Sequence, residues 1–220
     1  MGISGGGITM LWMAGLSALA LLICLPLFLH YKRALRLPLA VCFKGLGTLC
    51  AFVLALIAAV KLDPRCYVCS LALLIHVAAD IVLEFSFLVG GWLFLAGHLC
   101  YIAFFLSLVP VSAMHLICVL LLLGFSALFF WRWRKNIGKQ LPVFALYAAV
   151  LSVMCACALG CFASNTLSGI LIACGGALFF FSDSMLLRRL LFPSSRAMDW
   201  IIMFTYYAAQ LLFGIACLQL

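Results

Sequence analysis

Two aspartates lie inside apolar stretches of the sequence, where a charged side chain is costly. Asp183 ends an apolar run that starts at Gly175, and Asp80 ends another that starts at Cys66. A carboxylate at the centre of a bilayer helix costs about 2.5–3.5 kcal/mol, so a chain that keeps one usually uses it or pairs it. One carboxyl of a buried pair can hold a proton while the other stays ionised. The two aspartates therefore predict chemistry that needs a general acid and an opposed carboxylate.

Further polar side chains occur at a matching depth in the other apolar stretches. They are Lys44, His76, His98, Tyr101, Tyr147, Ser182, Tyr206, Tyr207 and Gln210. If successive helices alternate in direction, each of these residues falls about one to three turns from the same face of the membrane. Polar groups in lipid face one another or a hydrated cavity. We therefore expect one polar pocket, built around the two aspartates, that opens toward that face.

Helical spacing supports such a shared interior. Asp80 and Glu84 are four residues apart, which places them on one face of a helix. Gly169, Gly176 and Asp183 recur every seven residues. This second set predicts a seam of small residues for close helix packing that ends in the carboxylate.

Equal separations between polar residues raise the hypothesis of an internal repeat. Asp80 and Asp183 are 103 residues apart, and so are Lys44 and Tyr147. Four helices followed by four equivalent ones would give a parallel repeat about an axis along the membrane normal.

Eight apolar runs, each close to the length that spans a bilayer, carry these residues. They cover residues 8–29, 38–60, 66–83, 90–109, 113–131, 141–161, 166–187 and 199–218. The chain of 220 residues is 69% hydrophobic and only 8% charged, which excludes a soluble domain. We predict an all-α polytopic bundle of eight transmembrane helices, forming one membrane domain over residues 1–220.

Basic residues in the short loops predict the orientation of this bundle. Ten of them fall on one side of the predicted helices: Lys32, Arg33, Arg36, Arg132, Arg134, Lys135, Lys139, Arg188, Arg189 and Arg196. Only Lys61 and Arg65 fall on the other side. The positive-inside rule then puts both termini outside and the polar pocket near the cytoplasmic face of a bacterial inner (plasma) membrane. It also explains the net charge of +8 without nucleic-acid binding.

Structural and metal-binding interpretations of the same residues stay open. A lone aspartate–lysine pair in a membrane can simply neutralise itself. The residue types of a mixed histidine–carboxylate metal site are present in His76, Asp80, His98 and Asp183. The single Cys-x-x-Cys pair, which starts at Cys66, lacks the second half of a zinc site. We therefore assign no metal ligands.

The sequence resembles the YhhN-type lysoplasmalogenases of bacteria and their animal transmembrane relatives over most of its length. One matching block combines D-x-x-L at 80–83 with Gly-His-x-x-Tyr at 97–101. The most specific block is Gly-Ala-Leu-Phe-Phe-Phe-Ser-Asp-Ser at 176–184, followed by Thr-Tyr-Tyr-Ala-Ala-Gln at 205–210. Tyr147 resembles a residue of the family's middle helix.

The resemblance implies eight helices and hydrolysis of the vinyl ether bond of lysoplasmalogen, a lysophospholipid, to a fatty aldehyde and a glycerophospho-alcohol. Protonation of the β-carbon gives an oxocarbenium ion that water traps, so the reaction needs an acid and an opposed carboxylate but no cofactor. Asp80 and Asp183 would fill these roles in an order that the sequence leaves open, and Lys44 would meet the phosphate. The residues that would bind substrate or orient the pair are His98, Tyr101, Tyr147, Ser182, Tyr206, Tyr207 and Gln210.

Two other functions stay open as alternatives. A small lipid transporter or proton-coupled transporter could use the same pocket within the membrane lipid, and a parallel repeat is typical of that class. A metal-dependent intramembrane lipid hydrolase could use the histidines and aspartates together. Release of aldehyde by purified protein would distinguish the hydrolase from the transporter. Dependence of that activity on zinc would indicate the metal-dependent hydrolase.

Overall fold

Nine α-helices make up most of the chain in the computed structural model, which describes residues 5–220. They are α1 (Gly5–Ala18), α2 (Leu25–Arg33), α3 (Leu37–Lys61), α4 (Cys66–Leu83), α5 (Phe87–Leu108), α6 (Ala113–Ile137), α7 (Leu141–Gly160), α8 (Leu167–Leu191) and α9 (Arg196–Cys217). A π-helical segment, Leu19–Cys24, joins α1 to α2, and short 3₁₀ turns follow α6 and α7. No strand occurs within residues 5–220, so the all-α prediction is confirmed.

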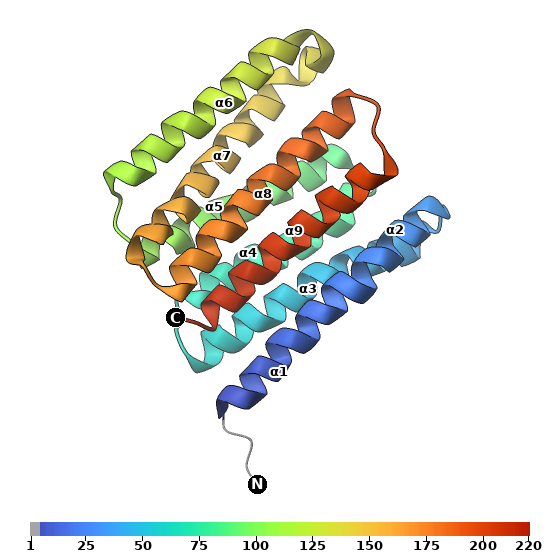
Figure 1. Ribbon diagram of the computed structural model, residues 1–220. Coiled ribbons are helices and arrows are strands. Elements are labelled where there is room, and N and C mark those ends of the chain that lie inside the picture. The colour runs from blue at the N-terminus through green and yellow to red at the C-terminus, as the bar shows by residue number, and fades with distance from the viewer. Residues whose placement is uncertain (1–4) are drawn as a thin grey trace.

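Seven apolar segments of the described chain are long enough to cross a membrane. Six of them are Met10–Arg33, Leu37–Lys61, Cys66–Leu83, Phe87–Leu108, Leu167–Leu191 and Arg196–Cys217. The seventh, Ala113–Ser164, is 52 residues long and contains two of the predicted runs. Within it, Gly138 has a φ of 63°, and α6 and α7 lie side by side on either side of this turn (Figure 1). These helices fit an integral membrane protein.

At one end of the bundle, helices extend past the apolar runs into basic sequence. α2 includes Lys32 and Arg33, α6 continues to Ile137, and α8 includes Arg188 and Arg189. Lysine and arginine are good helix formers, so the helix continues where the apolar surface ends. The start of α1 and the end of α9 lie at the opposite end of the bundle (Figure 1).

Pairs of neighbouring helices in the first half of the chain have counterparts in the second half. α3 packs against α4 as α7 packs against α8, and α4 packs against α5 as α8 packs against α9. α2 packs against α3 as α6 packs against α7. The two halves meet where α3 contacts α9 and where α5 contacts α7. As a result, α4 and α8, which carry the two aspartates, have corresponding neighbours.

Small residues allow the helices that carry the polar groups to approach closely. Gly176 of α8 lies against Ala158 of α7, and Gly214 of α9 lies against the carbonyl of Ala51 in α3. A β-carbon at either glycine would collide with its neighbour, so these contacts need the missing side chain. The small-residue seam predicted on α8 therefore faces α7, and it fixes the position of Asp183 relative to that helix.

Candidate active site

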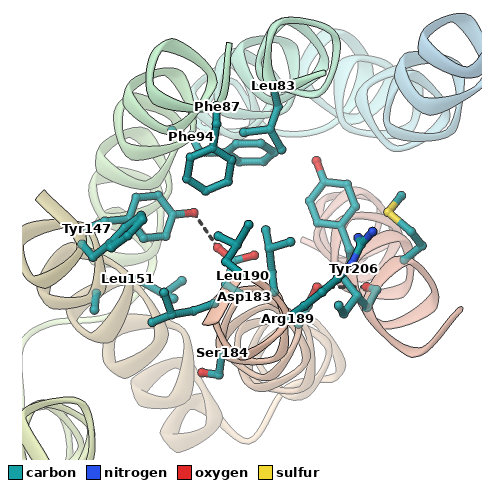
Figure 2. A pocket seen from close by; sticks show the side chains of 18 of the residues that line it. Leu83, Phe87, Phe94, Tyr147, Leu151, Asp183, Ser184, Arg189, Leu190 and Tyr206 are labelled. Carbon is teal, nitrogen blue, oxygen red and sulfur yellow. Dashed lines mark hydrogen bonds between the residues drawn. The ribbon is translucent and has the colours of Figure 1, made fainter. Parts of the chain in front are cut away.

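A cavity of about 660 Å³ lies toward the basic end of the bundle and is lined by residues of α2 through α9. Six of the ten predicted site residues line it: Lys44, Asp80, Tyr147, Ser182, Asp183 and Tyr206. Figure 2 shows Tyr147, Asp183 and Tyr206 extending toward the cavity from three different helices. The predicted pocket is therefore present, and both aspartates face it.

Asp80 is almost fully buried and is held by three neighbours. Its Oδ2 accepts hydrogen bonds from Thr48 Oγ1 at 2.5 Å and from the Tyr206 hydroxyl at 2.8 Å. Its Oδ1 has no hydrogen-bond partner among the described residues and lies 3.7 Å from Lys44 Nζ. One carboxylate oxygen is thus fixed by neutral donors, while the other lies beside a cation.

Lys44 is shared between Asp80 and Glu84, the residue that directly follows α4 and lies one helical turn beyond Asp80. Its Nζ donates to Glu84 Oε1 at 2.8 Å, and Lys32 Nζ donates to Glu84 Oε2 at 2.7 Å. The ring of Phe28 lies 5.6 Å from the Lys44 ammonium and 5.2 Å from that of Lys32. Lys44 therefore neutralises buried carboxylates, and its ammonium is enclosed by the protein with only 5% of the side chain exposed.

Glu84 follows the last residue of α4 and completes this row of charges. Burial raises the pKa of Glu84, but Lys44 and Lys32 lower it, and the resulting pKa lies below the ordinary value for glutamate. Two ammonium groups on one carboxylate outweigh its partial desolvation. Glu84 therefore stays ionised and holds Lys44 close to Asp80.

Asp183 has neutral neighbours instead. Its Oδ2 accepts a hydrogen bond of 2.5 Å from the Tyr147 hydroxyl (Figure 2). His98 Nε2 lies 3.9 Å from the same oxygen. No lysine or arginine of the described chain lies within 4.0 Å of its carboxylate oxygens. About 9% of the side chain is exposed, so the carboxyl reaches the cavity directly.

His98 and Tyr147 form a directed chain that ends on Asp183. His98 Nε2 lies 3.1 Å from the Tyr147 hydroxyl. Because that hydroxyl gives its single proton to Asp183, it accepts from His98, which assigns the proton of the neutral ring to Nε2. His98 Nδ1 is buried and has no partner among the described residues. The chain therefore aligns Tyr147 for donation to one oxygen of Asp183.

Gln210 connects the residues behind Asp80. Its Oε1 accepts from the Tyr101 hydroxyl at 2.5 Å, and its Nε2 donates to the Tyr206 hydroxyl at 3.0 Å. The same nitrogen lies 2.8 Å from His76 Nδ1, whose other ring nitrogen lies 3.2 Å from the Phe94 carbonyl oxygen. Gln210 and Tyr101 do not line the cavity; they orient Tyr206, which does.

Two further predicted site residues make contacts between helices. The Tyr207 hydroxyl donates to the Lys44 carbonyl at 2.9 Å, and Ser182 Oγ donates to the Ile202 carbonyl at 2.9 Å. Tyr207 does not line the cavity, whereas Ser182 lines its wall. Both hydroxyls are therefore used to attach α9 to α3 and to α8.

Several polar residues of the cavity region are absent from the predicted site set. They are Lys32, Arg33, Thr48, Glu84, Arg189 and Asp199. Thr48 is four residues after Lys44, and Glu84 is four residues after Asp80, so helical spacing could have added both. Lys32, Arg33 and Arg189 lie at helix ends, where a basic charge is interpreted as a topology signal. Asp199 lies in the first turn of α9.

The residues of the alternative metal site are used in hydrogen bonds and ring contacts. His76 and His98 meet edge to face with ring centroids 5.2 Å apart. Across the described residues there is no group of three or more histidine, cysteine or acidic side chains arranged to hold a metal ion. All twelve cysteines are free, and the Cys66 thiol contacts the Cys217 carbonyl.

Comparison with known families gives one match. The model of the YhhN family matches residues 39–216, a range that contains both aspartates and all of their hydrogen-bond partners. No match was found among curated proteins or among solved structures.

Proposed function

The chain belongs to the YhhN family, and we propose that it hydrolyses the vinyl ether bond of lysoplasmalogen within the membrane. Family membership suggests a membrane hydrolase and is consistent with this activity. The observation that carries the proposal is the pairing of Asp80 and Asp183 on one cavity, one beside a cation and the other beside neutral donors. A carboxylate and a carboxylic acid on one cavity are what the reaction needs.

The charges around the two aspartates support different roles for them. Lys44 favours the ionised form of Asp80, whereas the groups closest to Asp183 are a phenol and an imidazole. Tyr147 occupies Oδ2 of Asp183, and no described residue donates to Oδ1. We therefore assign the transferable proton to Asp183 Oδ1 and the stabilising carboxylate to Asp80.

The reaction then balances between these two groups. Asp183 transfers its proton to the β-carbon of the vinyl ether, and the double-bond electrons form the new C–H bond. The oxocarbenium ion that remains is stabilised by the Asp80 carboxylate. Water adds to the cationic carbon and gives a proton to Asp80, which yields a hemiacetal. Asp80 then protonates the glycerol oxygen as the C–O bond breaks, Asp183 takes the hydroxyl proton, and the aldehyde leaves.

The cavity also suits a single-chain amphiphile. Its polar end carries the charged side chains of α2, α8 and α9. Its apolar wall continues along α6 and α7 through Phe125, Phe129, Phe130, Val143 and Phe144. Sites for small ligands combine a mostly apolar lining with a few polar groups in this way. The alkenyl chain would lie along the phenylalanines, with the ether bond between the aspartates.

The arrangement in the membrane is part of the proposal. α6 and α7 would each cross the bilayer, which makes eight crossings and puts both termini on one side, outside the cell. The basic helix ends and the mouth of the cavity would face the cytoplasm of a bacterium, across its inner membrane. The corresponding helix neighbours in the two halves support a parallel repeat of four plus four helices.

The test is aldehyde release by purified protein in lipid nanodiscs. We expect release from an alkenyl lysophosphoethanolamine and none from the alkyl ether of the same chain length, which has no double bond to protonate. No release from either compound would contradict the proposal. The corresponding helix neighbours also suit a transporter, and substrate uptake into proteoliposomes without aldehyde would favour that alternative.

A further inference from the structure

Three charged side chains at the basic end of the cavity take no part in the two aspartate clusters. They are Arg33 of α2, Arg189 of α8 and Asp199 of α9, and all three line the cavity. Arg189 Nε lies 3.0 Å from Asp199 Oδ1, and Arg33 Nη2 lies 3.9 Å from Asp199 Oδ2. Their side chains are 39%, 33% and 22% exposed for Arg33, Arg189 and Asp199 respectively, so a ligand can reach each one.

Both guanidinium groups keep free donors. A guanidinium has five N–H donors, and its planar fork matches the oxygens of a phosphate. The terminal nitrogens of Arg189 make no hydrogen bond to any residue from 5 to 220. Arg33 uses one nitrogen, which lies 3.5 Å from the Arg196 carbonyl. Lys44, by contrast, is enclosed between two carboxylates and has little capacity for an outside anion.

The charges of this group match one class of headgroup. The two guanidiniums offer donors to the single negative charge of a phosphodiester, and the one carboxylate offers an acceptor for a single cation. Asp199 lies between the two arginines and can accept an ammonium group attached to that phosphodiester. A neutral glycerol headgroup would bring no anion for the free guanidinium donors, and a phosphomonoester would bring no cation for Asp199.

The spacing of Asp183 and Arg189 along α8 also matches the length of a lysophospholipid backbone. Arg189 is six residues after Asp183 on α8, a rise of about 9 Å along the helix axis. An extended glycerol backbone between the vinyl ether and the phosphorus has a similar length. Figure 2 shows both residues on α8 at the same cavity, with the Arg189 side chain extending toward α9.

We propose that Arg33, Arg189 and Asp199 form a subsite for the zwitterionic phosphodiester headgroup of a lysophospholipid, with the arginines on the phosphate and Asp199 on the amine. The choice of a lysophospholipid rests on the proposed function. The subsite selects the headgroup, while the two aspartates act on the ether bond.

The test uses ligands that cannot be cleaved. Binding of an alkyl-ether lysophosphoethanolamine and of the matching monoalkylglycerol is measured by calorimetry in nanodiscs for wild type, Arg189→Gln and Arg188→Gln. Arg188 is the adjacent exposed arginine, does not line the cavity, and controls for the loss of one charge. We expect Arg189→Gln to weaken binding of the phospholipid by about tenfold or more and to leave the monoalkylglycerol unchanged. Arg188→Gln should bind both ligands as wild type does.

A second variant tests the amine position. Asp199→Asn should lower the affinity for the phosphoethanolamine ether relative to a phosphoglycerol ether, which has no amine. The subsite is wrong if Arg189→Gln binds the phospholipid as tightly as wild type, or if it loses both ligands equally. Arg189→Lys keeps the positive charge but removes the planar guanidinium. An affinity for the phospholipid between those of wild type and Arg189→Gln would support the assignment. If wild type discriminates the headgroups but releases no aldehyde, the proposed function fails and the subsite stands.

Discussion

Asp80 and Asp183 lie 103 residues apart on α4 and α8, yet their surroundings differ in kind. Asp80 belongs to a charged row in which Lys44, Glu84 and Lys32 follow one another. Asp183 receives a hydrogen bond from Tyr147 and has no cation of the described chain within 4.0 Å. Lys44 lies beside Asp80 and Tyr147 beside Asp183, and these two neighbours are likewise 103 residues apart in the sequence.

The residues one turn after Lys44 on α3 and one turn after Tyr147 on α7 also differ in polarity. Thr48 donates to Asp80, whereas Leu151, again 103 residues later, offers no hydrogen bond and lines the cavity. A cation and a hydroxyl in one half are thus replaced by a phenol and an apolar side chain in the other. Similar helix packing can thus give one carboxyl a fixed negative charge and leave another free to carry a proton.

The largest expected effect on stability comes from removing the cation. Lys44→Met leaves Asp80 buried without an ion pair and Glu84 with Lys32 alone, and we expect it to lower the free energy of unfolding by about 3–5 kcal/mol. Tyr147→Phe, at the corresponding position, removes one hydrogen bond and should cost about 1–2 kcal/mol. Thermal unfolding in detergent measures both variants. Equal losses would mean that the two clusters do not differ in charge as described.

Substitutions of two adjacent tyrosines on α9 should have smaller effects that distinguish a residue of the site from a structural residue. Tyr206→Phe removes a donor from the Asp80 carboxylate, and aldehyde release should fall by about tenfold while the fold is kept. Tyr207→Phe, one residue later, removes a hydrogen bond to the Lys44 carbonyl and should mainly cost about 1 kcal/mol of stability. Initial rates and unfolding midpoints of the pair provide the measurement. Equal rates for the two variants would argue against a role for Tyr206 in positioning Asp80.

The sequence was sufficient to predict the helical membrane class and the residues around which the cavity forms. Apolar runs separated by short basic loops leave few alternatives to a helical bundle, because backbone groups in lipid must be satisfied within each helix. Asp80, Asp183 and Tyr147 could be grouped because alternating helices bring residues of equal depth to one level. The count of eight crossings goes beyond the seven apolar segments, since α6 and α7 lie in one continuous segment.

The direction of the Lys44 side chain could not be predicted from the sequence. Its side chain could point toward the membrane interface to meet a phosphate or inward to a carboxylate. The spacing of residues in the sequence does not distinguish these two orientations. Glu84 decides it, because this residue directly follows α4 and accepts a hydrogen bond from Lys44 of α3. Arg189 and Asp199 were hidden for another reason: their ion pair joins the end of α8 to the start of α9 across a loop. Charges at helix ends look alike in sequence whether they mark topology or line a cavity.

In the proposed reaction, Asp183 supplies the proton and Asp80 the stabilising charge. The most direct measurement is aldehyde release by Asp183→Asn in nanodiscs, beside wild type and Asp80→Asn, with unfolding midpoints and binding of the uncleavable ether as controls. We predict that Asp183→Asn binds the ether like wild type and loses about 10²–10⁴-fold in rate, because an amide has no proton to transfer. A rate for Asp183→Asn within about twofold of wild type, measured on folded protein, would contradict the claim.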